Sequence, residues 1–87
     1  MTLPTIHLNG TSKDELLQQV CDANNALNAA ISKLLEATPN ARDYYPQGPD
    51  AFRSAQKEHH ERYMRLQAVR GELEELACGI VDGGAKR

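Results

Sequence analysis

The sequence has little of several features that often stabilise small proteins. It contains two cysteines, no tryptophan and only four aromatic residues among its 87 residues. Two cysteines do not make a disulfide framework, so packing must hold the fold together. No apolar run approaches the ~20 residues that cross a bilayer, and no signal peptide with an apolar centre is present. We therefore expect a soluble, cytoplasmic protein.

The chain also lacks an excess of one charge. Its formal net charge is -2, and acidic and basic residues are interspersed. Without a polybasic surface, a nucleic-acid polymer is not an expected partner, and neither is a membrane. No acid, base or nucleophile stands at a meaningful spacing from another. An enzyme is therefore the least expected class, and no cofactor is expected.

Residues 5–9 alternate polar and apolar side chains, which favours a short, half-buried β-strand that Gly10 ends. No second strand signal follows in the sequence. Because a lone strand leaves its backbone groups unpaired, its expected partner is the same strand of another copy. The alternative is an extended arm that lies on the helices.

A helix is predicted over about residues 13–37. Ser12 and Glu15 form a capping box at its start, and a proline follows its end. Asn24 and Asn28 interrupt a second apolar row, where an asparagine either fixes the register between helices or presents an amide to a ligand. The main apolar row repeats at spacings of three and four: Leu16, Val20, Ala23, Leu27, Ile31 and Leu34.

The connection over about residues 38–50 is long, because helix–helix connections usually take ~2–8 residues. Pro39, Pro46 and Pro49 stiffen it, and it carries two of the four aromatic rings. These features favour an ordered functional loop. The alternative is a loop with only a structural role.

A second, longer helix is predicted over about residues 51–82, with Asp50 as its N-cap. Gly83 would end it and leave residues 83–87 as a frayed tail. One face of this helix carries a stripe of residues at helical spacing. The stripe is aliphatic from Leu66 onward and polar or aromatic before it, so we expect the functional site to lie near the loop. The stripe consists of Phe52, Ala55, His59, Tyr63, Leu66, Val69, Leu73, Leu76 and Ile80.

These segments make a single domain over residues 1–87. The fold class is mainly α: an antiparallel two-helix hairpin with a short N-terminal β-strand. Two helices bury one seam and leave the rows beside it in water, and so short a chain buries little core alone. We therefore expect the hairpins to assemble into a homo-oligomeric helical bundle.

Basic and aromatic side chains gather around the loop and the start of the second helix. That helix terminus offers free backbone N–H groups and a partial positive charge, arginine pairs phosphates, and tyrosine adds stacking faces. The combination suits a small anionic, nucleotide-like ligand. The candidate ligand-binding residues are Arg42, Tyr44, Tyr45, Arg53, Lys57, His59 and Tyr63. The alternative is that the arginines are solvated and the tyrosines pack the turn.

Two other chemistries have less support. His59 and His60 diverge by about 100° on a helix and cannot easily share an ion, so no metal site is expected. His59 fits better as a hydrogen-bonded core or interface residue. If the helices pair about the centre of the loop, Cys21 lies level with roughly residue 66, and Cys78 lies ~18 Å further along. Both cysteines are then expected to act as small hydrophobic residues.

Three stretches give the chain a resemblance to small uncharacterised proteins of tailed phages and prophages, from about Thr5 to Ile80. They are Ile-His-Leu-Asn-Gly-Thr-Ser, Asp-Glu-Leu-Leu and Asn-Ala-Arg-Asp-Tyr-Tyr-Pro-Gln-Gly. The resemblance implies a role in blunting host immunity. Some counter-defence proteins are helical oligomers that sequester nucleotide signals, the anti-Thoeris and anti-CBASS sponges. No sponge motif is matched residue by residue, so no site residue is carried over.

Three functions follow from these observations. The first is a phage counter-defence protein that sequesters a nucleotide-like signal in the host cytosol without turnover. The second is a protein-interaction module whose loop docks on a host defence protein and inhibits it. The third is a structural or assembly accessory of the phage particle.

Overall fold

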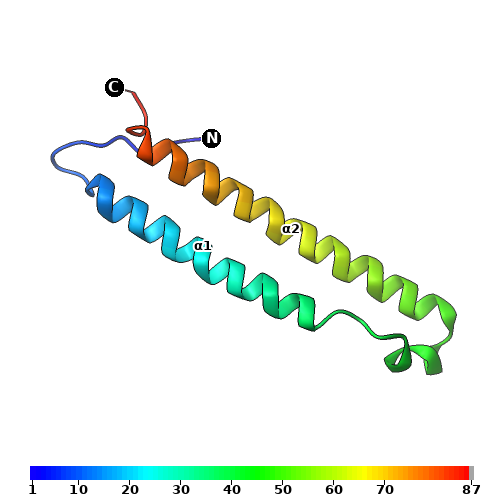
Figure 1. The fold of residues 1–87 in the computed structure, drawn as a ribbon. Coiled ribbons are helices and arrows are strands. Elements are labelled where there is room, and N and C mark those ends of the chain that lie inside the picture. The colour runs from blue at the N-terminus through cyan, green and yellow to red at the C-terminus, as the bar shows by residue number, and fades with distance from the viewer. Residues whose placement is uncertain (87) are drawn as a thin grey trace.

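Two long antiparallel helices make up most of the molecule (Figure 1). A computed structural model describes residues 1–86. Helix α1 spans Lys13–Glu36 and helix α2 spans Pro49–Val81, and two single-turn 3-10 helices, η1 (Ala41–Asp43) and η2 (Tyr45–Gln47), lie between them. The prediction of a mainly helical chain is confirmed. The hairpin is a rod of 62 × 20 × 17 Å, and the first and last described residues lie at the same end of it (Figure 1).

Local side-chain chemistry sets the start of α1. The Ser12 hydroxyl accepts a hydrogen bond from the Glu15 backbone N–H at 3.2 Å, which satisfies one of the free donors of the first turn. At the other end, the Ala37 N–H donates to carbonyl groups of the last turn, and Pro39 follows. The ends of this helix therefore follow directly from the sequence.

The start of α2 differs from the prediction. Gly48, not Asp50, is the N-cap residue, and Pro49 occupies the first helical position. Gly48 has a φ of 103°, which a residue with a side chain rarely adopts, and the fixed φ of proline suits the first turn. The glycine allows the chain to turn sharply from η2 into α2, so the helix begins before Asp50.

The predicted strand over residues 5–9 is absent from the described chain. Thr5 forms a single isolated antiparallel bridge with Gly84, and the chain turns at His7, whose carbonyl accepts from the Gly10 N–H. The partner of this segment is the C-terminal tail of the same chain, since the Ala85 N–H donates to the Pro4 carbonyl at 2.8 Å. The N-terminal segment is thus an extended arm on the helices.

The same contacts correct the prediction of a frayed tail over residues 83–87. Gly83 and Gly84 both have positive φ, and they turn the chain back after α2. The Gly84 N–H bonds to the Gly79 carbonyl, and Ala85 bonds to the arm. Residues 83–85 are therefore held in place, and Arg87 lies outside the described residues.

The register between the helices is also different from the predicted one. Thr38 lies beside His59, and the Arg70 guanidinium donates to Asn28 Oδ1 at 3.2 Å. The end of α1 is therefore level with His59, because η2 and the loop pack along the first turns of α2 and occupy that length. Cys21 and Cys78, predicted to lie far apart, line one small cavity of about 240 Å³.

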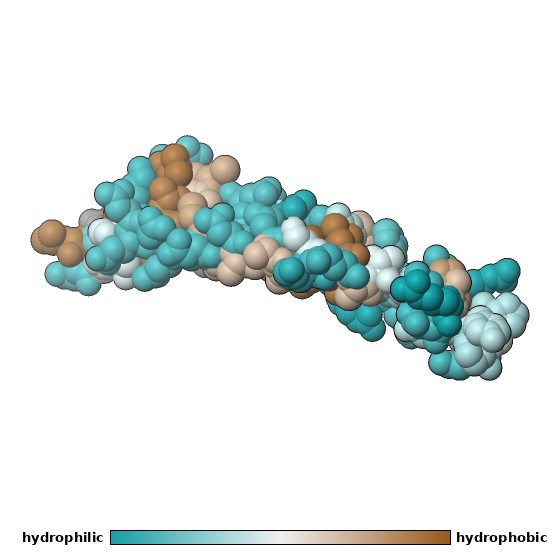
Figure 2. Space-filling model, turned by 60° about the horizontal axis from the view of Figure 1, so that its bottom comes forward, coloured by the Kyte–Doolittle hydropathy of each residue, from teal (hydrophilic) through white to brown (hydrophobic). Residues whose placement is uncertain are grey.

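The core is thin. Only Ile31, His59 and Ile80 are buried among the described residues. The leucines of both helices are half-buried or exposed, and on the face shown in Figure 2 hydrophobic side chains reach the surface in separate patches between polar ones. Helix pairs bury a single seam, so a hairpin alone leaves the rows beside that seam in water.

Among the described residues, neither helix is apolar enough over a sufficient length to cross a membrane.

Candidate functional site

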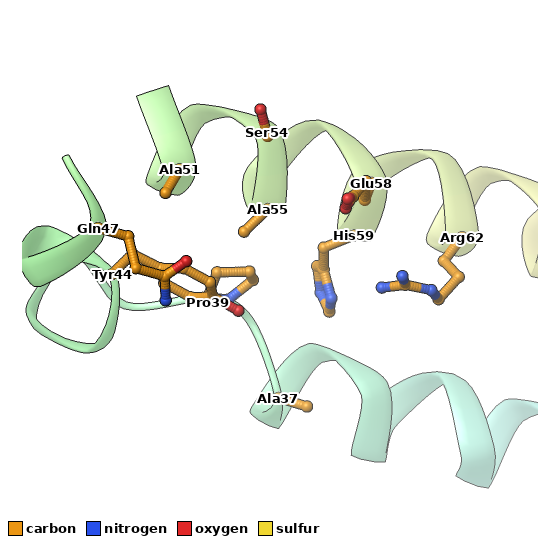
Figure 3. Close-up of a pocket in the computed structure, with 10 residues that line it drawn as sticks. All are labelled: Ala37, Pro39, Tyr44, Gln47, Ala51, Ser54, Ala55, Glu58, His59 and Arg62. Atoms are coloured by element: carbon orange, nitrogen blue, oxygen red, sulfur yellow. The ribbon is translucent and has the colours of Figure 1, made fainter. Parts of the chain in front are cut away.

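A cavity of about 360 Å³ lies between the connecting loop and the first turns of α2 (Figure 3). Its volume falls within the ~300–1,000 Å³ range of small-molecule sites. The lining combines apolar surface with hydroxyl, amide, imidazole, carboxylate and guanidinium groups. The residues are Ala37, Pro39, Tyr44, Gln47, Ala51, Ser54, Ala55, Glu58, His59 and Arg62.

The hollow exists because small side chains occupy one face of α2. Ala51 and Ala55 lie one turn apart on α2 and face the loop, which places no large side chain there (Figure 3). The Tyr44 ring borders the opposite side. Its centroid is 6.4 Å from that of Phe52, with the planes tilted by 38°, so the Phe52 ring helps to fix its orientation.

His59 forms the inner wall of the cavity and is only 8% exposed. The Thr38 hydroxyl donates to the Leu35 carbonyl at 2.6 Å, and Thr38 Oγ1 lies 3.3 Å from His59 Nε2. A hydroxyl has one proton, so Thr38 Oγ1 accepts from His59, whose Nε2 must carry a hydrogen. The interpretation of His59 as a hydrogen-bonded core residue is confirmed.

Two charged side chains border the cavity on the α2 side. In Figure 3 the Arg62 side chain extends toward the His59 ring, and Glu58 lies on the preceding turn. The guanidinium is a planar donor that matches phosphate or carboxylate oxygens, whereas the carboxylate accepts hydrogen bonds. The cavity therefore offers opposite charges to two different groups of one ligand.

A second cavity of about 440 Å³ lies on the other side of His59. It is mostly apolar and includes the Tyr63 ring, whose hydroxyl accepts a hydrogen bond from Gln67 Nε2 at 2.6 Å. No arginine or lysine lines this cavity, so it is less suited to binding an anion than the first cavity is. Its lining residues are Leu35, Thr38, Pro39, Gln56, His59, His60 and Tyr63.

The structure does not bring all seven predicted ligand-binding residues to one site. Tyr44 and His59 line the first cavity, and Tyr63 lines the second with His59. Four others, exposed on the loop or on α2, line neither cavity: Arg42, Tyr45, Arg53 and Lys57. The Arg42 backbone N–H bonds to Asn40 Oδ1 at the start of η1, so the local role of this residue is in the turn.

Sequence reasoning missed Arg62, Glu58 and Gln47 as lining residues. A signal was present for the first two, because Ala51, Ala55, Glu58 and Arg62 follow one another at spacings of three and four. Small residues on one face of a helix, followed by charged ones on the same face, predict a hollow with a charged rim. Gln47 could not be found in this way, because η2 places it.

The described residues contain no group of three or more histidine, cysteine, aspartate or glutamate side chains that could hold a metal ion. The two cysteines share their small cavity with Val20, Asn24, Asn25, Leu73, Glu74 and Ala77. Both thiols are free.

Comparison of the chain with protein-family models, with curated proteins and with solved structures gave no match. The geometry of the loop-end cavity is therefore the basis for a functional proposal.

Proposed function

We propose that the protein binds a small, anionic, nucleotide-like molecule in the loop-end cavity and sequesters it without turnover. The observation that carries this proposal is the placement of an aromatic ring, Tyr44, and a guanidinium group, Arg62, on the same cavity of about 360 Å³. A stacking face and a bidentate phosphate donor are the two groups that a nucleotide requires.

Glu58 makes the proposal more specific. A carboxylate on the cavity rim repels a simple anion, so inorganic phosphate alone is a poor ligand. A nucleotide can place its phosphate beside Arg62 and an exocyclic amino group or sugar hydroxyl near Glu58, while its base stacks on Tyr44. The site thus favours a molecule that carries both charge and hydrogen-bond donors.

The resemblance to small phage proteins supports a role for this capture in counter-defence. A homo-oligomer in the cytosol of the host cell would hold a nucleotide immune signal away from its effector. Capture requires only tight binding, and no group around the cavity is proposed to perform chemistry.

Thermal shift against a panel of cyclic dinucleotides, cyclic trinucleotides and cyclic ADP-ribose isomers tests the proposal. A ligand at 100 times its Kd stabilises a folded protein by about 2.7 kcal/mol, which is readily measured. We expect at least one member to raise the Tm, and Arg62→Gln to abolish the rise. Arg53→Gln is the matched control, because Arg53 is an exposed arginine on the same helix that does not line the cavity. No shift at micromolar ligand with folded protein would refute the proposal.

A second candidate function rests on Tyr45, which is 77% exposed at the tip of the loop. Tyrosine and arginine dominate binding energy at protein interfaces, and Arg42 is exposed on the same loop. A loop that docks on a host defence protein would use these two side chains. In a pull-down from host lysate, this candidate predicts a stoichiometric partner that Tyr45→Ala removes, whereas a nucleotide-binding protein brings down none.

A further inference from the structure

One flank of the hairpin carries a row of aliphatic side chains on α1 and two more on the second half of α2. The second cavity and the cysteine cavity lie on the opposite flank of the hairpin. Leu35 and His60 line the former, and Cys21, Glu74 and Cys78 line the latter. At 100° per residue, a set of aliphatic side chains on both helices falls on the other flank. We name this set the aliphatic flank: Leu16, Ala23, Leu27, Ala30 and Leu34 on α1, and Val69 and Leu76 on α2.

Every member of the aliphatic flank is half-buried or exposed. The leucines are half-buried, Val69 is 41% exposed, and Ala23 and Ala30 are exposed. The alanines leave room for the close approach of another helix. The opposite flank is mixed: Leu35 lies on it and is 51% exposed, whereas Asn28, Arg70, Tyr63 and Gln67 form hydrogen bonds across or along it.

The chain exposes more surface than a typical monomer of its mass. A monomer of 9.6 kDa is expected to expose about 5,100 Å². The chain exposes 6454 Å², roughly a quarter more. Its radius of gyration is 18.9 Å, against about 12 Å for a compact chain of this length. Two copies that each buried this excess would share roughly 2,700 Å², which lies in the range of obligate homodimers.

Charge indicates how a second copy is oriented. The first half of α2, residues 49–65, carries four basic and three acidic side chains, whereas its second half carries one basic and three acidic ones. The first half of α1, beside the acidic half of α2, is also net acidic. An antiparallel arrangement of two hairpins places the acidic end of each beside the less acidic, arginine-rich end of the other.

We propose that the aliphatic flank is the interface of a homodimer, in which two hairpins pack antiparallel as a four-helix bundle. This inference deepens the self-association proposed above by naming the face and the orientation. It does not depend on the ligand. The loop-end cavity lies on the same flank, between α2 and the loop, so the second copy packs beside its rim and narrows access to it.

Adjacent alanines on α1 provide a matched test of the face. Ala30 lies on the aliphatic flank, and Ala29 lies about 100° away on the outer surface of the helix. Both are exposed, so an arginine at either position is compatible with the folded hairpin. We expect sedimentation equilibrium to show a dimer for the wild type and for Ala29→Arg, and a Kd at least 100-fold weaker for Ala30→Arg.

Val69→Lys on α2 should weaken the dimer in the same way, whereas Met64→Lys, on the outer surface, should leave it intact. A monomeric wild type at 100 µM refutes both the self-association and this interface. A dimer that survives Ala30→Arg and Val69→Lys refutes the interface alone. Neither outcome touches the nucleotide proposal, whose thermal-shift test is separate.

Spin labels test the orientation. Arg53→Cys, with Cys21→Ser and Cys78→Ser, places one label near the loop end of each α2. Residue 53 lies 12 residues from the centre of α2, so fully overlapping antiparallel hairpins separate the two labels by about 35–40 Å, whereas parallel hairpins place them at the same level, within about 25 Å. A short distance in the dimer would overturn the antiparallel arrangement.

Discussion

Thr38 and His59 are 21 positions apart in the chain, yet their side chains meet at 3.3 Å between Oγ1 and Nε2. This contact joins the end of α1 to the third turn of α2. It marks the register between the two helices, and His59 lines both cavities at the loop end. Fold and candidate site therefore depend on the same pair.

The bond from His59 Nε2–H to Thr38 predicts different effects for two amide replacements. Glutamine places its side-chain nitrogen close to the Nε2 position, whereas the shorter asparagine does not reach it. We expect His59→Gln to reduce the free energy of unfolding by less than about 1 kcal/mol, and His59→Asn by about 2–3 kcal/mol, because the latter also leaves a gap. Urea unfolding measures both. Equal losses would show that the bond to Thr38 contributes nothing.

Asn24 and Asn28 of α1 should respond in opposite directions to replacement by leucine. Asn24 Oδ1 is buried without a hydrogen-bond partner among the described residues, whereas Asn28 Oδ1 accepts from Arg70. Asn24→Leu should therefore raise the free energy of unfolding by about 1–2 kcal/mol, and Asn28→Leu should lower it by about 1 kcal/mol. Thermal and urea unfolding measure the difference. A loss of stability in Asn24→Leu would indicate that its amide has a partner in the assembled protein.

Two glycines of α2 form another matched pair. A Cβ at Gly71 meets nothing within 4 Å, so Gly71→Ala should stabilise the chain by about 0.5–1 kcal/mol through helix propensity. A Cβ at Gly79 would lie 2.5 Å from Leu3 Cδ2, so Gly79→Ala should displace the N-terminal arm. Hydrogen exchange at the Ala85 amide, which bonds to Pro4, should speed up in Gly79→Ala only. Unchanged exchange would show that Leu3 repacks without releasing the arm.

Variants of the two neighbouring tyrosines of the loop distinguish binding in the cavity from binding at the exposed loop tip. Tyr44 lines the cavity, whereas Tyr45 is 77% exposed and does not. Loss of base stacking costs about 1–3 kcal/mol, so Tyr44→Leu should weaken nucleotide binding roughly 5- to 150-fold, and Tyr44→Phe should preserve most of it. Tyr45→Leu should bind as the wild type does. An equal loss in both leucine variants would place the ligand at the loop tip.

Much of the helical structure could be predicted from short-range signals. The Ser12 cap, the proline after α1 and the apolar periodicity of both helices act within a few residues, and the structure contains both helices. The register could not be predicted, because it depends on how η2 and the loop pack along α2, which no short-range signal reports. The strand prediction over residues 5–9 failed because alternation alone does not reveal the partner, which is the tail at Gly84.

The candidate site was predicted only in part for the same reason. The sequence indicated the loop end, Tyr44 and His59, but it selected Arg42, Arg53 and Lys57 because they are close in sequence to the start of α2. The structure places Arg62 at the cavity instead, since the loop reaches along α2 as far as the turn that carries His59 and Arg62. Proximity in sequence was a poor guide to a site built by long-range packing.

Isothermal titration calorimetry of the purified protein with the best ligand of the nucleotide panel tests the central claim most directly. The account predicts saturable binding in the micromolar range or tighter, lost in Arg62→Gln and retained in Arg53→Gln. Binding that Arg62→Gln leaves unchanged, or no heat from any nucleotide with the hairpin folded, would contradict it.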